Sequence, residues 1–81
     1  MGYTIGRMLT TNRKDLLRTR LRQIRQEKGV RQADLASALG RQQSYVAKFE
    51  SGEKSLGFIE VLDICRVLKH NPAALVRELM K

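Results

Sequence analysis

The chain has 81 residues, the length of one small domain, and carries sixteen Lys and Arg against eight Asp and Glu, for a net charge of +8. That balance favours an anionic partner, either nucleic acid or a membrane surface. A single cysteine excludes an internal disulfide, and the absence of a signal peptide and of an apolar run near ~20 residues predicts a soluble, cytoplasmic protein that does not span a membrane.

The first predicted elements are a tail and a long helix. Residues 1–11 contain two glycines and no clear periodicity, which predicts a flexible N-terminal tail ahead of a folded domain at residues 12–81. Asn12 is a favourable N-cap and Gly29 a favourable stop, so a helix is predicted between them. Its apolar stripe, at helical spacing, consists of Leu17, Leu21 and Ile24.

Two short helices should follow, each ended by a glycine. The first is predicted at residues 32–39 and the second at residues 42–51, with Gly40 and Gly52 as their stops. Their inward-facing residues are expected to be Leu35, Ala36, Leu39, Val46 and Phe49.

Two more helices complete the predicted fold. Gly57 is an acceptable N-cap for a helix at residues 58–68, which is apolar on more than one side and should lie in the middle of the core. The larger of its two apolar stripes consists of Phe58, Val61, Leu62, Cys65 and Leu68. Asn71 and Pro72 then begin a last helix that runs to about Met80. With no strong strand signal, the sequence predicts an all-α domain of five short helices.

The spacing within residues 32–51 predicts a helix-turn-helix. Two short helices that cross steeply need a small residue where their backbones approach, and Ala36 supplies it. Gly40 allows the positive φ that the turn needs, while Val46 and Phe49 pack the second helix inward.

The stretch "RQADLASALGRQQSYVAKFESGEKSLGFIEVLDICRVL" resembles the phage-repressor-type, Xre/Cro-like family of helix-turn-helix DNA-binding domains. The resemblance extends from about Leu17 to Leu79. It implies a compact five-helix, lambda-repressor-like domain that binds double-stranded DNA in a sequence-specific way. It also implies a transcriptional regulator, a repressor, that acts as a homodimer on a pseudo-palindromic operator.

The resemblance also implies roles for individual residues. The helix at 42–51 would lie in the major groove, where its base-contacting residues would be Gln42, Gln43, Ser44, Tyr45 and Lys48. The residues implied to contact phosphates are Arg31, Gln32, Arg41 and Lys54. Arg25 and Glu50 occupy positions where the family often has a partly buried ion pair. The chain departs from the family at Arg31, which lacks the usual capping hydroxyl, and at Gly57, where a weaker cap predicts fraying.

The chemistry of these side chains agrees with those roles. A glutamine amide pairs with adenine through two hydrogen bonds, and lysine favours guanine O6 and N7. The recognition stretch is nearly neutral because residues 32–52 carry no net charge, whereas residues 1–31 carry +7. Phosphate attraction is independent of sequence, so it can come from outside the helix that reads bases.

Several other residues have simpler structural explanations. Leu75, Val76, Leu79 and Met80 either seal the core or form a dimer face. Cys65 lies on an apolar stripe and is expected in the core, and His70 has no ligand partners nearby in sequence. No nucleophile–base set, carboxylate pair or phosphate-cradling loop is visible, so neither catalysis nor a cofactor or metal is expected.

Two alternatives stay open. The basic residues Arg7, Arg13 and Lys14 are expected to be solvated, although they would also suit an arm that reaches along DNA. The alternative function is a protein-interaction module, such as an antitoxin that binds a toxin while keeping this fold.

Overall fold

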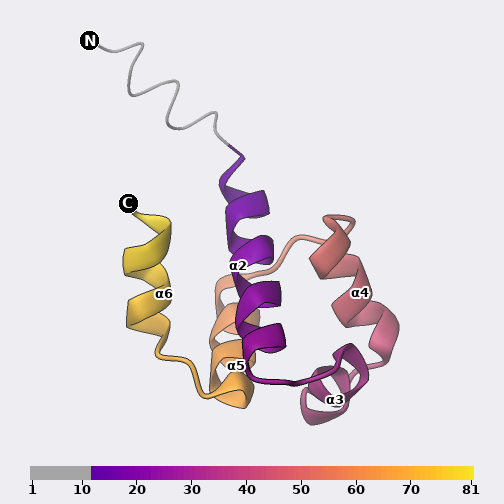
Figure 1. Ribbon diagram of the computed structural model, residues 1–81. Helices are drawn as coiled ribbons and strands as arrows, with labels where there is room; N and C mark the ends of the chain where they lie inside the picture. Colours follow the sequence, from indigo (N-terminus) through magenta and orange to yellow (C-terminus); the bar gives the residue numbers. More distant parts are fainter. Residues whose placement is uncertain (1–11) are drawn as a thin grey trace, which may run out of the picture.

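The computed structural model describes residues 12–81, which form five helices joined by short connections, with no strand in this part of the chain (Figure 1). In chain order the helices are α2 (Arg13–Glu27), α3 (Gln32–Ala38), α4 (Gln43–Ser51), α5 (Phe58–Leu68) and α6 (Pro72–Leu79). The all-α prediction is confirmed, and each predicted helix is present with its ends shifted by less than one turn. The predicted tail, residues 1–11, lies outside the described residues, and so does Arg7.

Local capping explains where the helices begin and end. The Asn12 side chain accepts a hydrogen bond from the Asp15 backbone N–H at 3.1 Å, which fixes the first turn of α2. Asn71 caps α6 in the same way, through the Ala73 backbone N–H at 2.8 Å. α5 ends at Leu68, as the sequence predicted, and its C-cap is Lys69, a non-glycine residue with φ of 54°.

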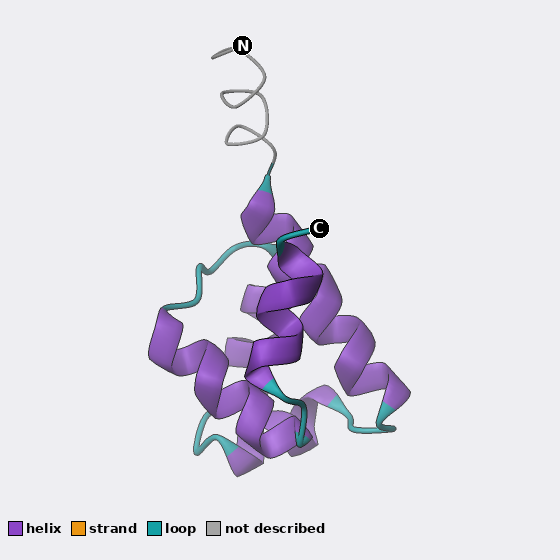
Figure 2. Cartoon of the chain, turned by 90° about the vertical axis from the view of Figure 1, so that its left-hand side faces the viewer, coloured by secondary structure: helices purple, strands orange, loops and turns teal. Residues whose placement is uncertain are grey.

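The helices enclose one core, and α2 packs against it through Leu21, Ile24 and Arg25. Figure 1 shows α6 on one side of α2 and the pair α3–α4 on the other, with α5 below and behind. The view in Figure 2, turned by 90°, shows the same all-helical packing from the side of α6. The nearly fully buried apolar residues come from all five helices and are Leu21, Ile24, Leu35, Ala36, Val46, Phe49, Ile64, Cys65, Leu68 and Leu75.

The structure corrects the predicted position of one apolar residue and decides that of another. Phe58 was predicted in the core, but it is 73% exposed, because the buried residues of α5 begin one turn and a half later, at Ile64. Leu75, for which the sequence left open a place in the core or in a dimer face, is only 2% exposed and packs in the core of the same chain. A dimer face on α6 therefore cannot include Leu75.

The remaining apolar residues of α6 form a small surface groove with the start of α2. Val76 and Met80 are exposed, Leu79 is half-buried, and Leu16 of α2 is exposed beside them. Arg13 lines the same groove and donates a hydrogen bond to the Leu79 carbonyl at 3.2 Å. Among residues 12–81, none of the helices is both long enough and apolar enough to cross a membrane.

Candidate nucleic-acid interface

The crossing of α3 and α4 forms the frame of the candidate site. Ala36 and Val46 are both buried where the two helices approach each other, as the helix-turn-helix spacing predicted. The turn between the helices passes through Gly40, whose φ of 69° suits glycine and strains other residues. The backbone N–H of Arg41 then donates to the Ala36 carbonyl at 2.8 Å, which closes the turn and sets the direction of α4.

A buried ion pair fixes the C-terminal half of α4 against α2. Arg25 and Glu50 are 8% and 5% exposed, and the guanidinium meets the carboxylate through two bonds, Nε–Oε2 at 2.7 Å and Nη2–Oε1 at 3.0 Å. The remaining Arg25 nitrogen, Nη1, donates to the Val30 carbonyl at 2.8 Å. The pair is therefore satisfied by hydrogen bonds on both sides, which a buried charge requires.

A chain of amides connects this ion pair to the exposed end of α4. The Gln32 Nε2 donates to Glu50 Oε1 at 2.9 Å, and the Gln43 Nε2 donates to Gln32 Oε1 at 3.4 Å. Because a carboxylate only accepts, Gln32 must turn its amino group toward Glu50 and its carbonyl toward Gln43. The buried charge of Glu50 thus orients the Gln43 amide through Gln32.

Arg18 of α2 holds the end of α4 in a way that the sequence did not reveal. Its Nη1 donates to the Glu50 carbonyl at 2.8 Å, and its Nε contacts Asp15 Oδ1 at 2.7 Å. Gly52 caps α4 with φ of 92°, and a Cβ there would lie 3.2 Å from Arg18 Nε. Gly52 therefore serves both the left-handed turn and the close approach of Arg18.

Four of the five residues predicted to contact bases lie on one exposed surface. Gln42 is the N-cap residue of α4, and its side chain makes no capping hydrogen bond. Gln43 and Ser44 follow in the first turn, and Lys48 lies one turn further along, all of them exposed. A row of donors and acceptors at a helix N-terminus is the arrangement that fits a DNA major groove.

Tyr45 is placed differently from the other four. It is half-buried, its ring meets Phe49 edge to face with centroids 5.8 Å apart, and its hydroxyl donates to the Glu60 carboxylate of α5. Burial and the bond to Glu60 raise the pKa of the Tyr45 hydroxyl to about 12. The hydroxyl is therefore engaged within the protein, on the side of α4 that faces α5.

The residues predicted to contact phosphates occupy both sides of α4. Arg31 stands before α3 without a side-chain cap and pairs with Asp34 through Nε–Oδ2 at 2.9 Å, a hydrogen bond that lowers the pKa of Asp34. Gln32 lies beside it at the start of α3. On the other side, the Arg41 guanidinium lies 4.7 Å from the centre of the Tyr45 ring and the Lys54 Nζ lies 5.6 Å from it.

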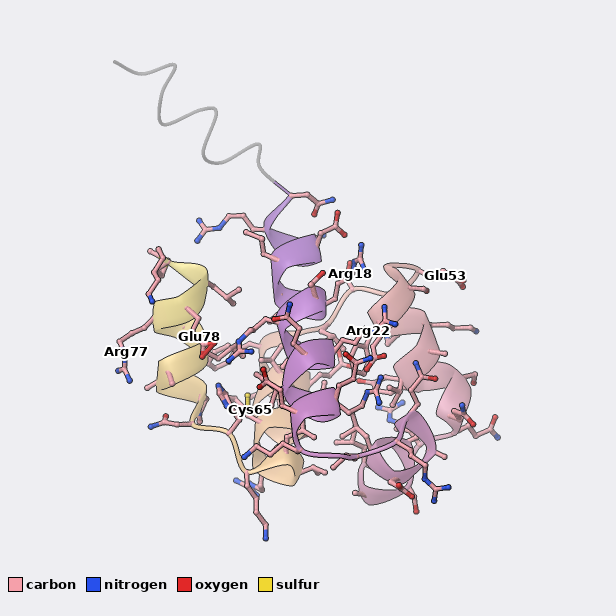
Figure 3. The ribbon with its side chains drawn as sticks, viewed as in Figure 1. Arg18, Arg22, Glu53, Cys65, Arg77 and Glu78 are labelled. Atoms are coloured by element: carbon pink, nitrogen blue, oxygen red, sulfur yellow. The ribbon has the colours of Figure 1, made fainter. Side chains whose placement is uncertain are left out.

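Sequence reasoning also missed Arg22. It lies one turn from both Arg18 and Arg25, which contact Glu50, so all three occupy the face of α2 turned toward α4. Figure 3 shows Arg22 beside α4, whereas Arg77 points away on the far side of α6. Arg22 is exposed and forms no ion pair with an acid of residues 12–81. The sequence could have indicated this position, because Arg22 lies four residues after Arg18 and so on the same face of α2.

The opposite side of α2 carries charges that pair among themselves. Arg20 contacts both Glu78 of α6 and Glu27, and Glu78 also lies 3.2 Å from the His70 Nε2. The bond to Arg20 is the main reason that the pKa of Glu78 is lowered. Within residues 12–81, no three His, Cys, Asp or Glu side chains gather in a way that could hold a metal ion. These contacts therefore link α2 to α6.

Comparison with known proteins agrees with this geometry. A family model described as a helix-turn-helix domain matches residues 16–79. The chain is also similar to a solved structure, an XRE-family like protein from Pseudomonas syringae pv. tomato str. DC3000, with 36% identity, a TM-score of 0.84, and 94% of this chain and 93% of that one covered. The search of curated proteins found no match. The chain therefore belongs to the Xre/Cro-like family of helix-turn-helix DNA-binding proteins, which is not a family of enzymes.

Proposed function

We propose that residues 12–81 act as a sequence-specific DNA-binding domain of a transcriptional repressor, with α4 in the major groove. The observation that carries the proposal is the exposed row of Gln42, Gln43, Ser44 and Lys48, one of which is oriented through Gln32 by the buried charge of Glu50. Preorganised donors and acceptors favour discrimination between base pairs, because little order is lost on binding.

Cations on both sides of α4 support the same proposal. The cations Arg22 and Arg31 and the neutral amide of Gln32 lie toward α2 and α3, and the cations Arg41 and Lys54 lie toward α5. A major groove is bordered by two phosphate backbones, so a helix inserted in it needs phosphate contacts on each side. We therefore assign base reading to the exposed residues of α4 and phosphate binding to the cations on either side of it.

A homodimer is the form in which we propose that the domain acts. Two copies would place their α4 helices in successive major grooves about 34–36 Å apart, on a pseudo-palindromic site. Because Leu75 is in the core, the candidate dimer surface keeps Val76, Leu79 and Met80 of α6 and gains the exposed Leu16 of α2. The partners proposed are thus double-stranded DNA and a second copy of the chain.

We expect selection from a random pool of duplexes at moderate salt to enrich one consensus with two inverted half-sites. The half-site centres should lie about 10–10.5 base pairs apart, the spacing that a two-fold dimer imposes. Sequencing of the bound fraction after several rounds is the measurement. Enrichment of no consensus would refute sequence-specific binding, and a consensus without inverted symmetry would refute the dimer alone.

A second prediction concerns Arg22. Replacing it by alanine should weaken cognate and unrelated duplexes by the same factor and lower the magnitude of the salt slope by about 0.9, as for one lost phosphate contact. Binding isotherms at several salt concentrations measure both quantities. Arg77→Ala removes the same charge from the far side of α6 and serves as the matched control. Equal slopes for the two variants would show that Arg22 acts only through the net charge.

The second candidate function is a protein-interaction module, for example an antitoxin. The observation that favours it is the pair Phe58 and Ile59, two consecutive large apolar residues that are exposed at the start of α5. Co-purification with the product of the neighbouring gene would test this function. If Phe58→Ser abolishes the protein complex while the variant still enriches the same DNA consensus, one domain serves both functions.

A further inference from the structure

Two cations from opposite ends of α4 converge on one aromatic ring. Arg41 precedes the helix and Lys54 follows it, yet the guanidinium carbon of Arg41 and the Nζ of Lys54 lie 4.7 Å and 5.6 Å from the centroid of Tyr45. Both distances are within the range in which the negative face of an aromatic ring attracts a cation. The ring therefore brings together two charges that the chain separates by the length of the recognition helix.

The Tyr45 ring is held in place by contacts within the protein. Its edge packs against the buried Phe49, and its hydroxyl donates to Glu60 of α5. Glu60 also accepts from the Gly57 backbone N–H at 2.8 Å, so one carboxylate links the ring to the first turn of α5. This contact also stabilises the start of α5, where the sequence predicted fraying. Tyr45 is thus fixed by two helices before any ligand arrives.

Neither Arg41 nor Lys54 forms an ion pair within residues 12–81, although both lie near enough to Glu60 to contribute to the lowered pKa of its carboxyl, after its hydrogen bonds to Tyr45 and Gly57. Ion pairs are formed, by contrast, by Arg18, Arg20, Arg25 and Arg31. A tyrosine face orients a cation without cancelling its charge, because the ring carries no net charge. Both groups therefore remain able to bind an anion.

The position of the cluster indicates which anion. Gln43 and Glu50 lie on the side of α4 that faces α2 and α3, through Gln32 and Arg25, whereas Tyr45 lies on the side that faces α5. We propose that Tyr45 is a positioning residue, not a base-reading one, which holds Arg41 and Lys54 as a pair against the phosphates of one DNA backbone. This inference rests on the proposed DNA binding and deepens it, because it assigns one border of the groove to this cluster.

The test compares Tyr45→Leu, which removes the ring, with Tyr45→Phe, which keeps the ring and removes the hydroxyl. Tyr45→Leu should weaken cognate and unrelated duplexes by the same factor and lower the magnitude of the salt slope by up to about 1.8, as for two lost phosphate contacts. Tyr45→Phe should keep a slope close to that of the wild type. Arg41→Gln and Lys54→Gln together should lower the slope as much as Tyr45→Leu, and adding Tyr45→Leu to them should lower it no further.

Because Tyr45 packs against Phe49, folding of each variant is checked by circular dichroism, and Tyr45→Met is the replacement if the leucine variant unfolds. Its flexible side chain fills a similar space but presents no ring, so the same fall in slope is expected. A change of base preference with an unchanged slope would overturn the inference in favour of base reading. An equal fall for Tyr45→Phe would overturn it in favour of a direct hydroxyl contact.

The two proposals can fail separately. Phosphate contacts do not depend on base sequence, so the salt slope on random DNA still reports the cluster when no consensus is enriched. If the wild type enriches a consensus but has the same salt slope as Tyr45→Leu, the proposed role of Tyr45 is refuted and the proposed DNA binding stands. If the wild type binds no duplex at low salt, both proposals are refuted.

Discussion

Replacing Glu50 by alanine is expected to lower the free energy of unfolding by about 3–5 kcal/mol, because it leaves the buried guanidinium of Arg25 without its carboxylate. Glu50 also accepts from Gln32, so a third hydrogen bond is lost besides the two from Arg25. Small domains are stable by only about 5–15 kcal/mol, so this variant should be close to unfolding at room temperature. Chemical denaturation followed by circular dichroism measures the change.

Two further variants make that result interpretable. Glu53→Ala removes an exposed acid three residues away and should change the free energy of unfolding by no more than about 0.5 kcal/mol. The double replacement Arg25→Met with Glu50→Leu removes both charges, and it should recover most of the loss, because the desolvation cost disappears with the pair. A Glu50→Ala variant as stable as Glu53→Ala would show that the ion pair contributes nothing.

The double variant also separates stability from DNA recognition. It should fold, yet it has no carboxylate to orient Gln32, so the constraint on Gln43 is lost. We therefore expect it to bind DNA with normal salt dependence but with weaker discrimination between sequences. If the double variant regained both the stability and the sequence discrimination of the wild type, the Glu50 charge would serve folding alone.

Much of the fold was predictable because local signals agree with it. Asn12, Asn71 and Pro72 start helices through their own side chains, and Gly40 and Gly52 stop helices through positive φ. Such signals need no knowledge of distant contacts. The helix-turn-helix spacing was predictable for the same reason, since Ala36 and Val46 lie only ten residues apart.

The features that the sequence left open or gave wrongly depend on distant contacts. Phe58 and Leu75 have the same apolar character, and only the packing of α5 and α6 decides that one is exposed and the other buried. The resemblance implied that Tyr45 contacts bases, and only the structure shows that a carboxylate fifteen residues later engages its hydroxyl. Arg18 escaped notice because its partner is the backbone carbonyl of Glu50, which leaves no trace in side-chain chemistry.

In the candidate site, too, some features follow from local sequence and others depend on distant contacts. Exposed residues of α4 were identified from their position alone, whereas the network that orients them was not. An ion pair between Arg25 and Glu50 was implied by the family, but its connection to Gln43 through Gln32 required coordinates. The orientation of an amide depends on which neighbour accepts and which donates, and sequence spacing carries no such information.

That orientation leads to the largest expected effect on recognition. The Gln43 amino group uses one hydrogen toward Gln32, so its second N–H and its carbonyl remain for DNA. One donor and one acceptor side by side match the N7 and N6 groups of adenine in the major groove. We therefore expect the consensus to contain an adenine in each half-site at the base pair that Gln43 faces.

Gln43→Ala should reduce discrimination at that one base pair by about 1–3 kcal/mol and leave the salt slope unchanged, because no phosphate contact is lost. Gln32→Met, which keeps the length of the side chain without its amide, should relax the preference at the same base pair, since Gln43 is then free to rotate. Competition binding with duplexes substituted at each position measures both effects. Lys54→Ala is the contrasting control, because it should weaken all duplexes alike and lower the slope. If Gln43→Ala weakened cognate and random DNA equally, Gln43 would have no part in choosing the sequence, and the amide network would serve only to join α3 to α4.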